Sequence, residues 1–292
     1  MIENVTSSKQ YLYHYTKACT ALDYIVHNHT LQFGRYTGTN DPKESKVWEF
    51  NLGTNEERDL GQYKLSELSE WLSMALKGKT KLACFSMDSE GLSGNHMLDI
   101  FKRGFCKPRM WAQYANRHTG VCLVFDRQKL EELIDRTYSK DKLVLDGAIT
   151  YKDRNIVPDL YNPDDQQSMI NIDFLETMGS DSYIEAHLRT HYKRLFFEKM
   201  DDWKDESEWR CIVFSQTDEN LYLNFEDSLV GIMFGENTEE KAVQDIMDAT
   251  ESWGLHYMGL KWKNCSPWYD YENLRYIRGI KNSPWGETIK RV

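Results

Sequence analysis

The sequence predicts an α+β fold in which helices flank a β-sheet. Of its 292 residues, 40% are hydrophobic and 13% aromatic, which is ample for a substantial core. Short apolar runs typical of strands come in clusters, and helical patterns separate them unevenly, which favours α+β over a regular alternating sheet. The chain shows no internal repeat, low-complexity tract or linker. We therefore expect residues 1–292 to form a single domain.

The pattern of apolar residues predicts the individual elements. Strands are expected at 81–86, 121–125, 147–151, 209–214, 229–234 and 255–260. Helices are expected at 18–26 with Thr16 as its cap, at 65–76, 109–116 and 182–199, and between a cap at Asn237 and a stop at Gly254. Strand 209–214 is apolar on both faces and should be central. It should share one sheet, or two facing sheets, with 81–86 and 121–125, with Cys84, Cys122 and Cys211 buried.

The segment 157–167 differs in composition from its surroundings. It contains two prolines and clustered acidic residues but few apolar ones, so ordering it would gain little burial. We predict a mobile insertion at about 157–167 that is dispensable for folding.

Charge and cysteine content limit the possible functions and locations. The formal net charge is −10, opposite to that of proteins that bind duplexes by neutralising phosphates. We interpret the basic cluster of Lys102, Arg103, Lys107 and Arg109 as a solvated loop. The six cysteines form no Cys-x-x-Cys pair, and the chain has neither an apolar signal segment nor an apolar run of membrane-spanning length. These features predict a cytoplasmic protein with reduced thiols and no membrane partner.

Several short strings occur together in a characteristic order. They are Leu12-Tyr13-His14-Tyr15-Thr16, Asn40-Asp41-Pro42-Lys43-Glu44, Cys84-Phe85-Ser86, Trp111-Ala112-Gln113-Tyr114-Ala115, 118–125, Trp203 and Glu206-Ser207-Glu208-Trp209-Arg210. In this order they resemble the bacterial family called domain of unknown function 2971, over about residues 11–260. Lys43 is a departure, because the family pattern has an aromatic residue there.

A more distant resemblance carries a function. The His-Tyr-Thr string, a strand ending in Ser86, and Glu206-x-Glu208 entering a late strand are similar to the plan of ADP-ribosyltransferases. That resemblance implies a split β-sheet core that binds NAD as a substrate and breaks its nicotinamide–ribose bond. Glu208 would stabilise the cationic ribose, as carboxylates do in glycoside cleavage. Glu206 would orient the acceptor from the same strand face if the chain is extended there.

The same resemblance assigns the NAD-holding residues. His14, next to Thr16, would hydrogen-bond the adenosine-side ribose, Tyr15 or Tyr114 would stack on nicotinamide, and Ser86 would orient the carboxylate. Each has a structural alternative. Glu208 can pair with Arg210 on its own strand face, His14 can be a satisfied structural group, the tyrosines can be core, and Ser86 can be a turn residue.

Two rival sites involve metals. His187 and His191 lie four residues apart on an expected helix, but no Glu follows the first as in a His-Glu-x-x-His motif, so we favour a buried structural pair. Asn40, Asp41 and Glu44 offer three oxygens for a nuclease-type cation, yet Asn-Asp-Pro is an ordinary turn initiator. We expect no metal, and glycine-rich nucleotide loops are absent from the sequence.

The leading hypothesis is an NAD-consuming ADP-ribosyltransferase-like enzyme, or an NAD glycohydrolase if the acceptor is water. The acceptor is otherwise an unidentified protein or nucleic acid. The alternative is a non-catalytic sensor or specificity module of the same fold that binds a nucleotide or a partner.

Overall fold

The computed structural model describes residues 5–154, 163–217, 219–264 and 266–270. The strands are β1 (Tyr11–Thr16), β2 (Thr30–Arg35), β3 (Asn51–Gly53), β4 (Thr80–Met87), β5 (Val121–Asp126), β6 (Leu143–Ala148), β7 (Thr150–Tyr151), β8 (Met169–Asn171), β9 (Glu198–Lys199), β10 (Glu208–Phe214), β11 (Leu221–Asn224), β12 (Leu229–Phe234), β13 (His256–Lys263) and β14 (Ser266–Asp270). The helices are α1 (Ala18–Thr20), which continues as a π-helix (Ala21–Val26), α2 (Pro42–Ser45), α3 (Leu65–Gly78), α4 (His96–Asp99), α5 (Pro108–Gln113), α6 (Arg127–Tyr138), α7 (Ile172–Met178), α8 (Ser180–Phe196) and α9 (Glu240–Ala249).

Within the described residues, ten strands form one large sheet. Its main path runs β11-β2-β4-β1-β5-β12-β13-β14, and β10 with β6 extends it from the other edge of β4. Every pair is antiparallel except β12 and β13, which are parallel. The sheet and its flanking helices confirm the predicted mixed fold, and β4, β5 and β10 share one sheet as expected.

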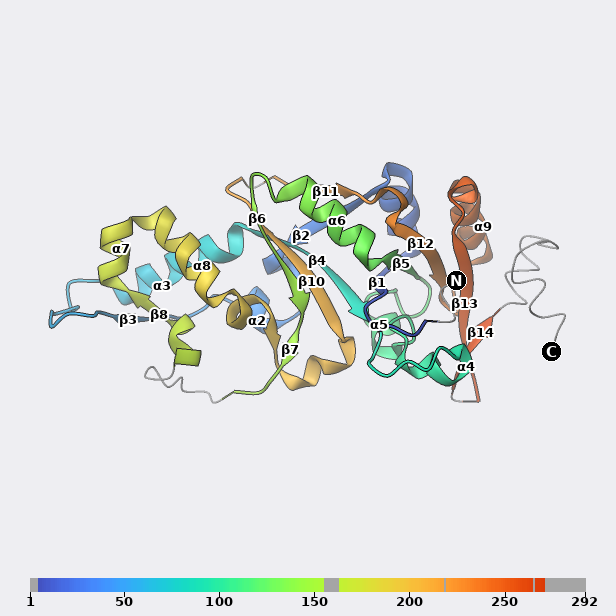
Figure 1. The fold of residues 1–292 in the computed structure, drawn as a ribbon, viewed down its shortest axis with the longest axis horizontal. Coiled ribbons are helices and arrows are strands. Elements are labelled where there is room, and N and C mark those ends of the chain that lie inside the picture. Colours follow the sequence, from blue (N-terminus) through green and yellow to red (C-terminus); the bar gives the residue numbers. More distant parts are fainter. Residues whose placement is uncertain (1–4, 155–162, 218, 265, 271–292) are drawn as a thin grey trace.

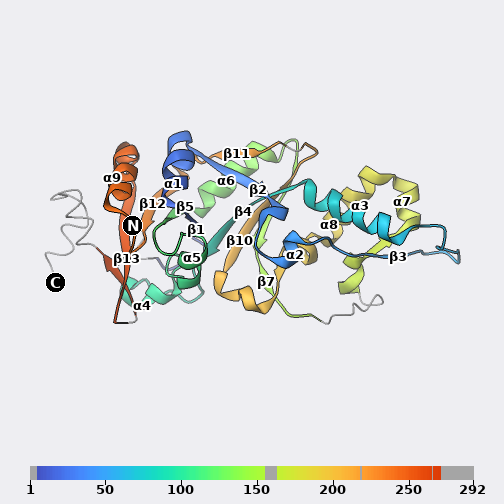
Figure 2. The ribbon, with the colours of Figure 1, turned by 180° about the vertical axis from the view of Figure 1, so that it is seen from behind.

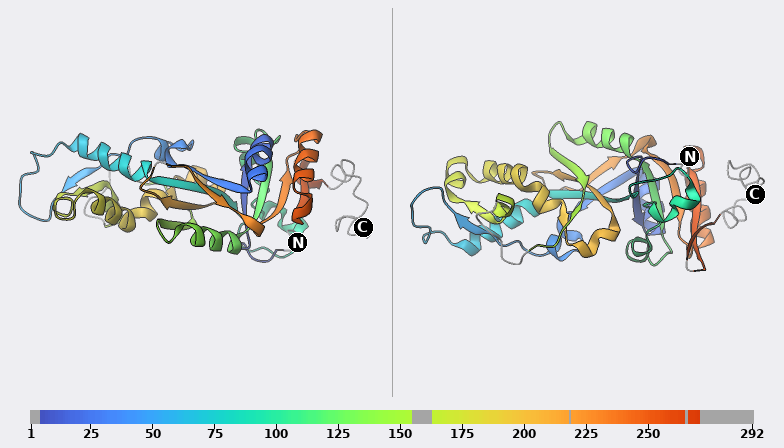
Figure 3. Two further views of the ribbon diagram at one scale, coloured as in Figure 1. Left: turned by 90° about the horizontal axis from the view of Figure 1, so that it is seen from above. Right: turned by 60° about the horizontal axis from the view of Figure 1, so that its bottom comes forward.

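The molecule is elongated, and its helices are unevenly distributed along it (Figure 1). Helices α3, α7 and α8 gather at one end with the small β3–β8 pair, while α9 lies beside β13 at the other end. Seen from behind, α1 and α9 lie close together at that second end, and the view from above shows the same arrangement (Figures 2 and 3). None of the described helices has both the length and the hydrophobicity that a membrane crossing demands.

The sheet is split along one edge of β4. Near its start, Lys81 and Leu82 pair with β2, and near its end, Ser86 and Met87 pair with β1. Cys84, between these two ladders, pairs with neither strand on that edge. The opposite edge is continuous, because β10 pairs with β4 from Thr80 to Ser86. The split leaves the main chain around Cys84 without a strand partner on that edge.

Strand β10 is buried along its whole length, as its sequence predicts. Side chains alternate along a strand, so Trp209 and Cys211 pack into the core on one face of the sheet. On the other face, Glu208 and Arg210 share their side with Ile212, which packs in the core beneath α3 and α8. Two charged residues are thereby fixed on the buried face of a rigid strand.

Several local predictions are corrected by the structure. Thr16 does not cap the first helix, because it is the last residue of β1 and Lys17 occupies the cap position. Asn237 does not cap α9, which begins after Glu239. Gly254, with a φ of 68°, does end the short 3-10 helix that follows α9, because its backbone is left-handed. Cys122 and Cys211 are buried as predicted, whereas Cys84 is only half-buried.

The structure corrects one part of the predicted basic cluster and describes part of the predicted insertion. Arg103 is not on a solvated loop, because it is 1% exposed and its guanidinium pairs with Asp88 at 3.0 Å. Of the predicted insertion at 157–167, residues 157–162 lie outside the described residues. Residues Pro163–Ser168 form a 3-10 helix, and the main-chain carbonyl of Gln167 lies 3.2 Å from His187 Nε2.

Candidate functional site

A cleft of about 360 Å³ adjoins the split edge of β4, and we call it the central cleft. It is lined by Tyr13, His14, Tyr15, Gly38, Thr39, Asn40, Glu44, Cys84, Phe85, Met110, Tyr114, Lys199, Glu206 and Glu208. The structure therefore brings together His14, Tyr15, Tyr114, Glu206 and Glu208, which come from opposite ends of the sequence. It does not bring Ser86 or Thr16 to this lining.

Glu208 and Glu206 converge on one ammonium group. Lys199 Nζ lies 2.7 Å from Glu208 Oε2 and 2.9 Å from Glu206 Oε2. The chain between the two carboxylates is not extended as expected: Glu206 ends a 3-10 helix and Ser207 is left-handed, with a φ of 45°. The turn at Ser207, rather than strand alternation, places both carboxylates on one side.

Arg210 completes a buried ionic network. Its Nε and Nη2 each lie 2.6 Å from Glu208 Oε1, and its Nη1 lies 2.7 Å from Glu44 Oε1. Glu44, Glu206, Glu208, Lys199 and Arg210 thus form a cluster of three carboxylates and two cations, all at most 5% exposed in their side chains. The structural alternative for Glu208, an ion pair with Arg210, is present, and Glu208 lines the cleft as well.

The cluster fixes the charge of Glu208. Burial alone would raise its pKa, but Arg210 and Lys199 outweigh that effect and lower the pKa to about 2. Although burial opposes a charged Lys199, Glu208 and Glu44 hold the pKa of Lys199 well above its ordinary value. Near neutral pH the cleft wall therefore carries an ionised carboxylate at Glu208 beside two cations.

Tyr114 joins the cluster to the cleft mouth. Its hydroxyl donates to Glu206 Oε1 at 2.9 Å and lies 3.1 Å from Asn40 Oδ1. Burial and the nearby Glu206 raise the pKa of Tyr114, so it remains a phenol and a hydrogen-bond donor. Tyr15 is more constrained, because its hydroxyl donates to the Gly104 carbonyl at 2.7 Å and its ring packs edge-on against Trp111.

His14 bridges the split in the sheet. Its Nδ1 lies 3.0 Å from the Cys84 carbonyl, the main-chain acceptor that no strand pairs with on that edge. A carbonyl only accepts, so Nδ1 carries the proton. Burial lowers the pKa of His14, which leaves the ring neutral and Nε2 an acceptor with no partner among the described residues.

Ser86 and Thr16 have different surroundings from those predicted. Ser86 is buried, and its hydroxyl donates to the main-chain carbonyl of Glu206 at 2.8 Å. It fixes the turn that carries Glu206 instead of contacting the Glu208 carboxylate. Thr16 lines a separate groove of about 850 Å³, together with Thr20, Tyr24 and Gln32, and His14 lines this polar groove too.

The residues of the two rival metal sites contact other groups of the protein. Asp41 caps α2 by accepting from the Lys43 amide at 2.9 Å, and Glu44 faces Arg210, so the two carboxylates serve separate structural roles. The rings of His187 and His191 contact each other in a tilted arrangement, with centroids 4.7 Å apart and an interplanar angle of 54°. Over the described residues, no group of three or more His, Cys, Asp or Glu side chains is arranged to hold a metal.

Sequence reasoning missed Lys199, Glu44 and Tyr151 as parts of this site. Tyr151 accepts a hydrogen bond from the Glu208 amide at 2.8 Å and thereby fixes the start of β10. The available signal was one of charge: two glutamates and one arginine entering a buried strand require further counter-charges. Nothing in the local pattern says that β9 and α2 supply them.

The comparisons with known proteins add one match. The sequence profile of a family described as "Protein of unknown function (DUF2971)" matches residues 110–211. The match runs from α5 to β10, and so covers Tyr114, Lys199, Glu206 and Glu208, and it confirms the family resemblance over that segment. No curated protein matches the chain. No solved structure matches it.

Proposed function

We propose that the protein binds NAD in the central cleft and cleaves its nicotinamide–ribose bond, passing ADP-ribose to a macromolecule or to water. The observation that carries the proposal is the meeting of His14 from β1 with Glu208 from the start of β10 and Glu206 from the end of the preceding 3-10 helix around one cleft. A neutral imidazole acceptor stands on one side and an ionised carboxylate on the other. Those are the groups needed to hold ribose hydroxyls and to stabilise a ribosyl cation.

The chemical step is a substitution at the ribose carbon that carries nicotinamide. The carbon–nitrogen bond breaks with its electron pair leaving on nicotinamide, and a lone pair of the acceptor forms the new bond. The acceptor's proton passes to solvent or to a base. Glu208 stabilises the positive charge on the ribose, and Glu206 orients the acceptor next to Tyr114. Because the pKa of Glu208 is about 2, its negative charge is available throughout the neutral range.

A second function, binding without turnover, is favoured by the cations around Glu208. Arg210 and Lys199 both lie within 2.7 Å of its carboxylate oxygens and offset most of its charge. A carboxylate whose charge is offset in this way can still orient a ribose hydroxyl, but it stabilises the positive charge that develops on the ribose less strongly. This observation supports a sensor or specificity module that recognises a nucleotide.

The deciding experiment measures nicotinamide release and NAD affinity together. Purified protein is incubated with NAD, with and without protein and nucleic-acid acceptors, while calorimetry gives the affinity. Under the enzymatic proposal, Glu208→Gln lowers kcat by at least about 100-fold and leaves NAD binding largely intact, since the lost interaction is made mainly in the transition state. His14→Ala instead weakens NAD binding.

Glu198→Gln is the matched control. Glu198 is also a buried glutamate, and it pairs with Arg154 at 2.7 Å, but it does not line the central cleft. Its substitution perturbs a comparable ion pair and should leave nicotinamide release unchanged in folded protein. NAD binding without release in the wild type supports the module instead, and absence of both binding and release rejects the enzyme and any module that recognises NAD.

A further inference from the structure

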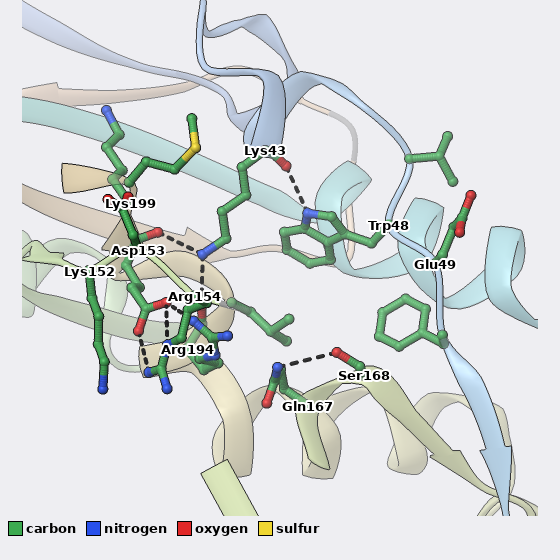
Figure 4. Close-up of a pocket in the computed structure, with 15 residues that line it drawn as sticks. Lys43, Trp48, Glu49, Lys152, Asp153, Arg154, Gln167, Ser168, Arg194 and Lys199 are labelled. Atoms are coloured by element: carbon green, nitrogen blue, oxygen red, sulfur yellow. Dashed lines mark hydrogen bonds and ion pairs between the residues drawn. The ribbon is translucent and has the colours of Figure 1, made fainter. Parts of the chain in front are cut away.

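A second cavity, of about 570 Å³, is also lined by Lys199, and we call it the basic pocket. Figure 4 shows Lys43 reaching into it from α2, with Lys152 and Arg154 on one wall and Arg194 from α8 below. Trp48 packs beside Lys43 and donates its indole N–H to the Lys43 carbonyl at 2.7 Å. Neither the family resemblance nor the proposed NAD chemistry uses this pocket.

Lys43 has an unusual set of partners for a lysine. Its Nζ donates to the main-chain carbonyls of Arg194 at 2.9 Å and Glu198 at 2.6 Å. No carboxylate of the described residues lies within ion-pairing distance of it. A neutral amine has two N–H donors and one lone pair, so two carbonyl acceptors satisfy it completely. The lone pair is then left for the pocket.

Burial and the surrounding charges also favour the neutral form of the Lys43 amine. Burial is the main cause, and the nearby Arg194 adds to it; together with Arg210 they outweigh Asp41 and Glu44 and lower the pKa of Lys43 to about 7. The carboxylate of Glu198 does not compensate Lys43, because it holds Arg154 in a two-point contact and also pairs with Arg194. A much larger fraction of Lys43 than of an ordinary lysine is therefore unprotonated at neutral pH.

We propose that Lys43 is the nucleophilic amine of a second site, where it forms an imine with a small aldehyde or ketone that carries a carboxylate or phosphate. The amine lone pair attacks the carbonyl carbon, and loss of water, made from the carbonyl oxygen and the two amine hydrogens, leaves a carbon–nitrogen double bond. No oxidant or reductant is needed. Five basic and three acidic side chains line the pocket, and Arg154, Arg194 and Lys199 among them are paired with glutamates. Lys152 is exposed and has no ion-pair partner among the described residues, so it is the cation that would bind the anionic group. Amines desolvated beside another cation are activated in this way.

The experiment traps the imine in the full-length wild-type protein. The protein is incubated with glyoxylate and reduced with cyanoborohydride, and modified lysines are mapped by peptide mass spectrometry. Lys43 should be labelled at pH 7 at least about tenfold faster than any exposed lysine, because an ordinary lysine has less than about 0.1% neutral amine at that pH. Labelling should rise through about pH 7 and level off above about pH 8.

Two comparisons make the outcome decisive. Lys152 lines the same pocket but is exposed, so equal labelling of Lys152 and Lys43 would overturn the proposal. Lys43→Arg should abolish the major adduct, with a thermal midpoint confirming the fold. Propionaldehyde lacks the anionic group and should label Lys43 more slowly than glyoxylate; equal rates would reject the anionic class. The map of modified lysines in the wild-type protein tests Lys43 by itself, so the test remains valid even if a variant fails to fold. It also does not depend on whether the protein cleaves NAD.

Discussion

Replacing Glu208 by glutamine should destabilise the fold in a pH-dependent way. The substitution keeps the shape of the side chain but leaves Arg210 with Glu44 and Lys199 with Glu206 as their remaining carboxylate partners. Removing one member of a buried ion pair typically costs about 3–5 kcal/mol, because a charge stays buried without its partner. The surviving partners place this case at the lower end of that range.

The pKa of Glu208 gives a separate measure of the same effect. The pKa falls from an ordinary value of 4.5 to about 2 in the folded protein. A shift of that size corresponds to about 3 kcal/mol of stability near pH 7. Because the folded pKa is the lower one, this stability is fully present above pH 4.5 and is lost as the pH falls towards 2. At pH 3.5 about 2 kcal/mol should remain.

Urea unfolding followed by tryptophan fluorescence tests both values. Wild type and Glu208→Gln are compared at pH 7 and pH 3.5. The comparison is valid only if the free energy of unfolding falls with urea concentration at the same slope in both proteins. We expect the free energy of unfolding of the variant to lie about 3 kcal/mol below that of wild type at pH 7. This difference should be smaller by about one third at pH 3.5. A difference below about 1 kcal/mol at pH 7, or one that does not change with pH, would refute the ionised buried network.

Two further predictions concern packing and accessibility. Gly120→Ala should lower the free energy of unfolding by at least about 2 kcal/mol, because a Cβ there would lie 2.2 Å from the Thr16 carbonyl oxygen. Gly78→Ala, whose Cβ would meet nothing within 4 Å, is the control in the same urea assay. Iodoacetamide labelling of the native protein should modify exposed Cys19 first and buried Cys211 last. Half-buried Cys84 lines the central cleft, so bound NAD should slow its labelling, and an unchanged rate would argue against NAD in that cleft.

The central strands of the sheet could be predicted from sequence, because β4, β5 and β10 are largely buried on both faces. The predicted strands at 81–86, 121–125 and 209–214 fall within a residue or two of β4, β5 and β10, since continuous apolar runs leave little choice of structure. Helix α6 went unpredicted although its signals are present. Asp126 caps it by accepting from the Lys129 amide, and Leu130, Leu133 and Ile134 follow helical spacing.

The site was harder to predict, because its geometry depends on long-range pairing. His14 and Glu208 reach one cleft only because β1 and β10 lie on opposite edges of β4, and no local pattern specifies that order. The left-handed turn at Ser207 is equally invisible, since serine seldom adopts a positive φ and nothing nearby requires it. The carboxylates could be recognised as candidates, whereas Lys199 could not.

His14 has two separable roles, and one substitution distinguishes them. Its Nδ1 bonds the Cys84 carbonyl across the split in the sheet, whereas Nε2 is the group available to a ligand. His14→Asn places an amide N–H near the position of Nδ1 but offers nothing in place of Nε2. We therefore expect its stability at pH 7.5 to stay within about 1 kcal/mol of wild type, while NAD affinity falls about tenfold, the value of one hydrogen bond.

The pH dependence gives an independent check on the same substitution. Burial lowers the pKa of His14 below 6.5, so protonation of the unfolded chain costs the wild type stability as the pH falls below that value. Asparagine does not titrate, and the variant should gain stability relative to wild type between pH 7.5 and pH 5. If the variant binds NAD as well as wild type does, His14 only joins the two halves of the sheet, and the NAD proposal loses one of its two anchoring groups. If instead it unfolds at pH 7.5, the asparagine amide does not reproduce the bond to the Cys84 carbonyl, and the expected separation of the two roles is wrong.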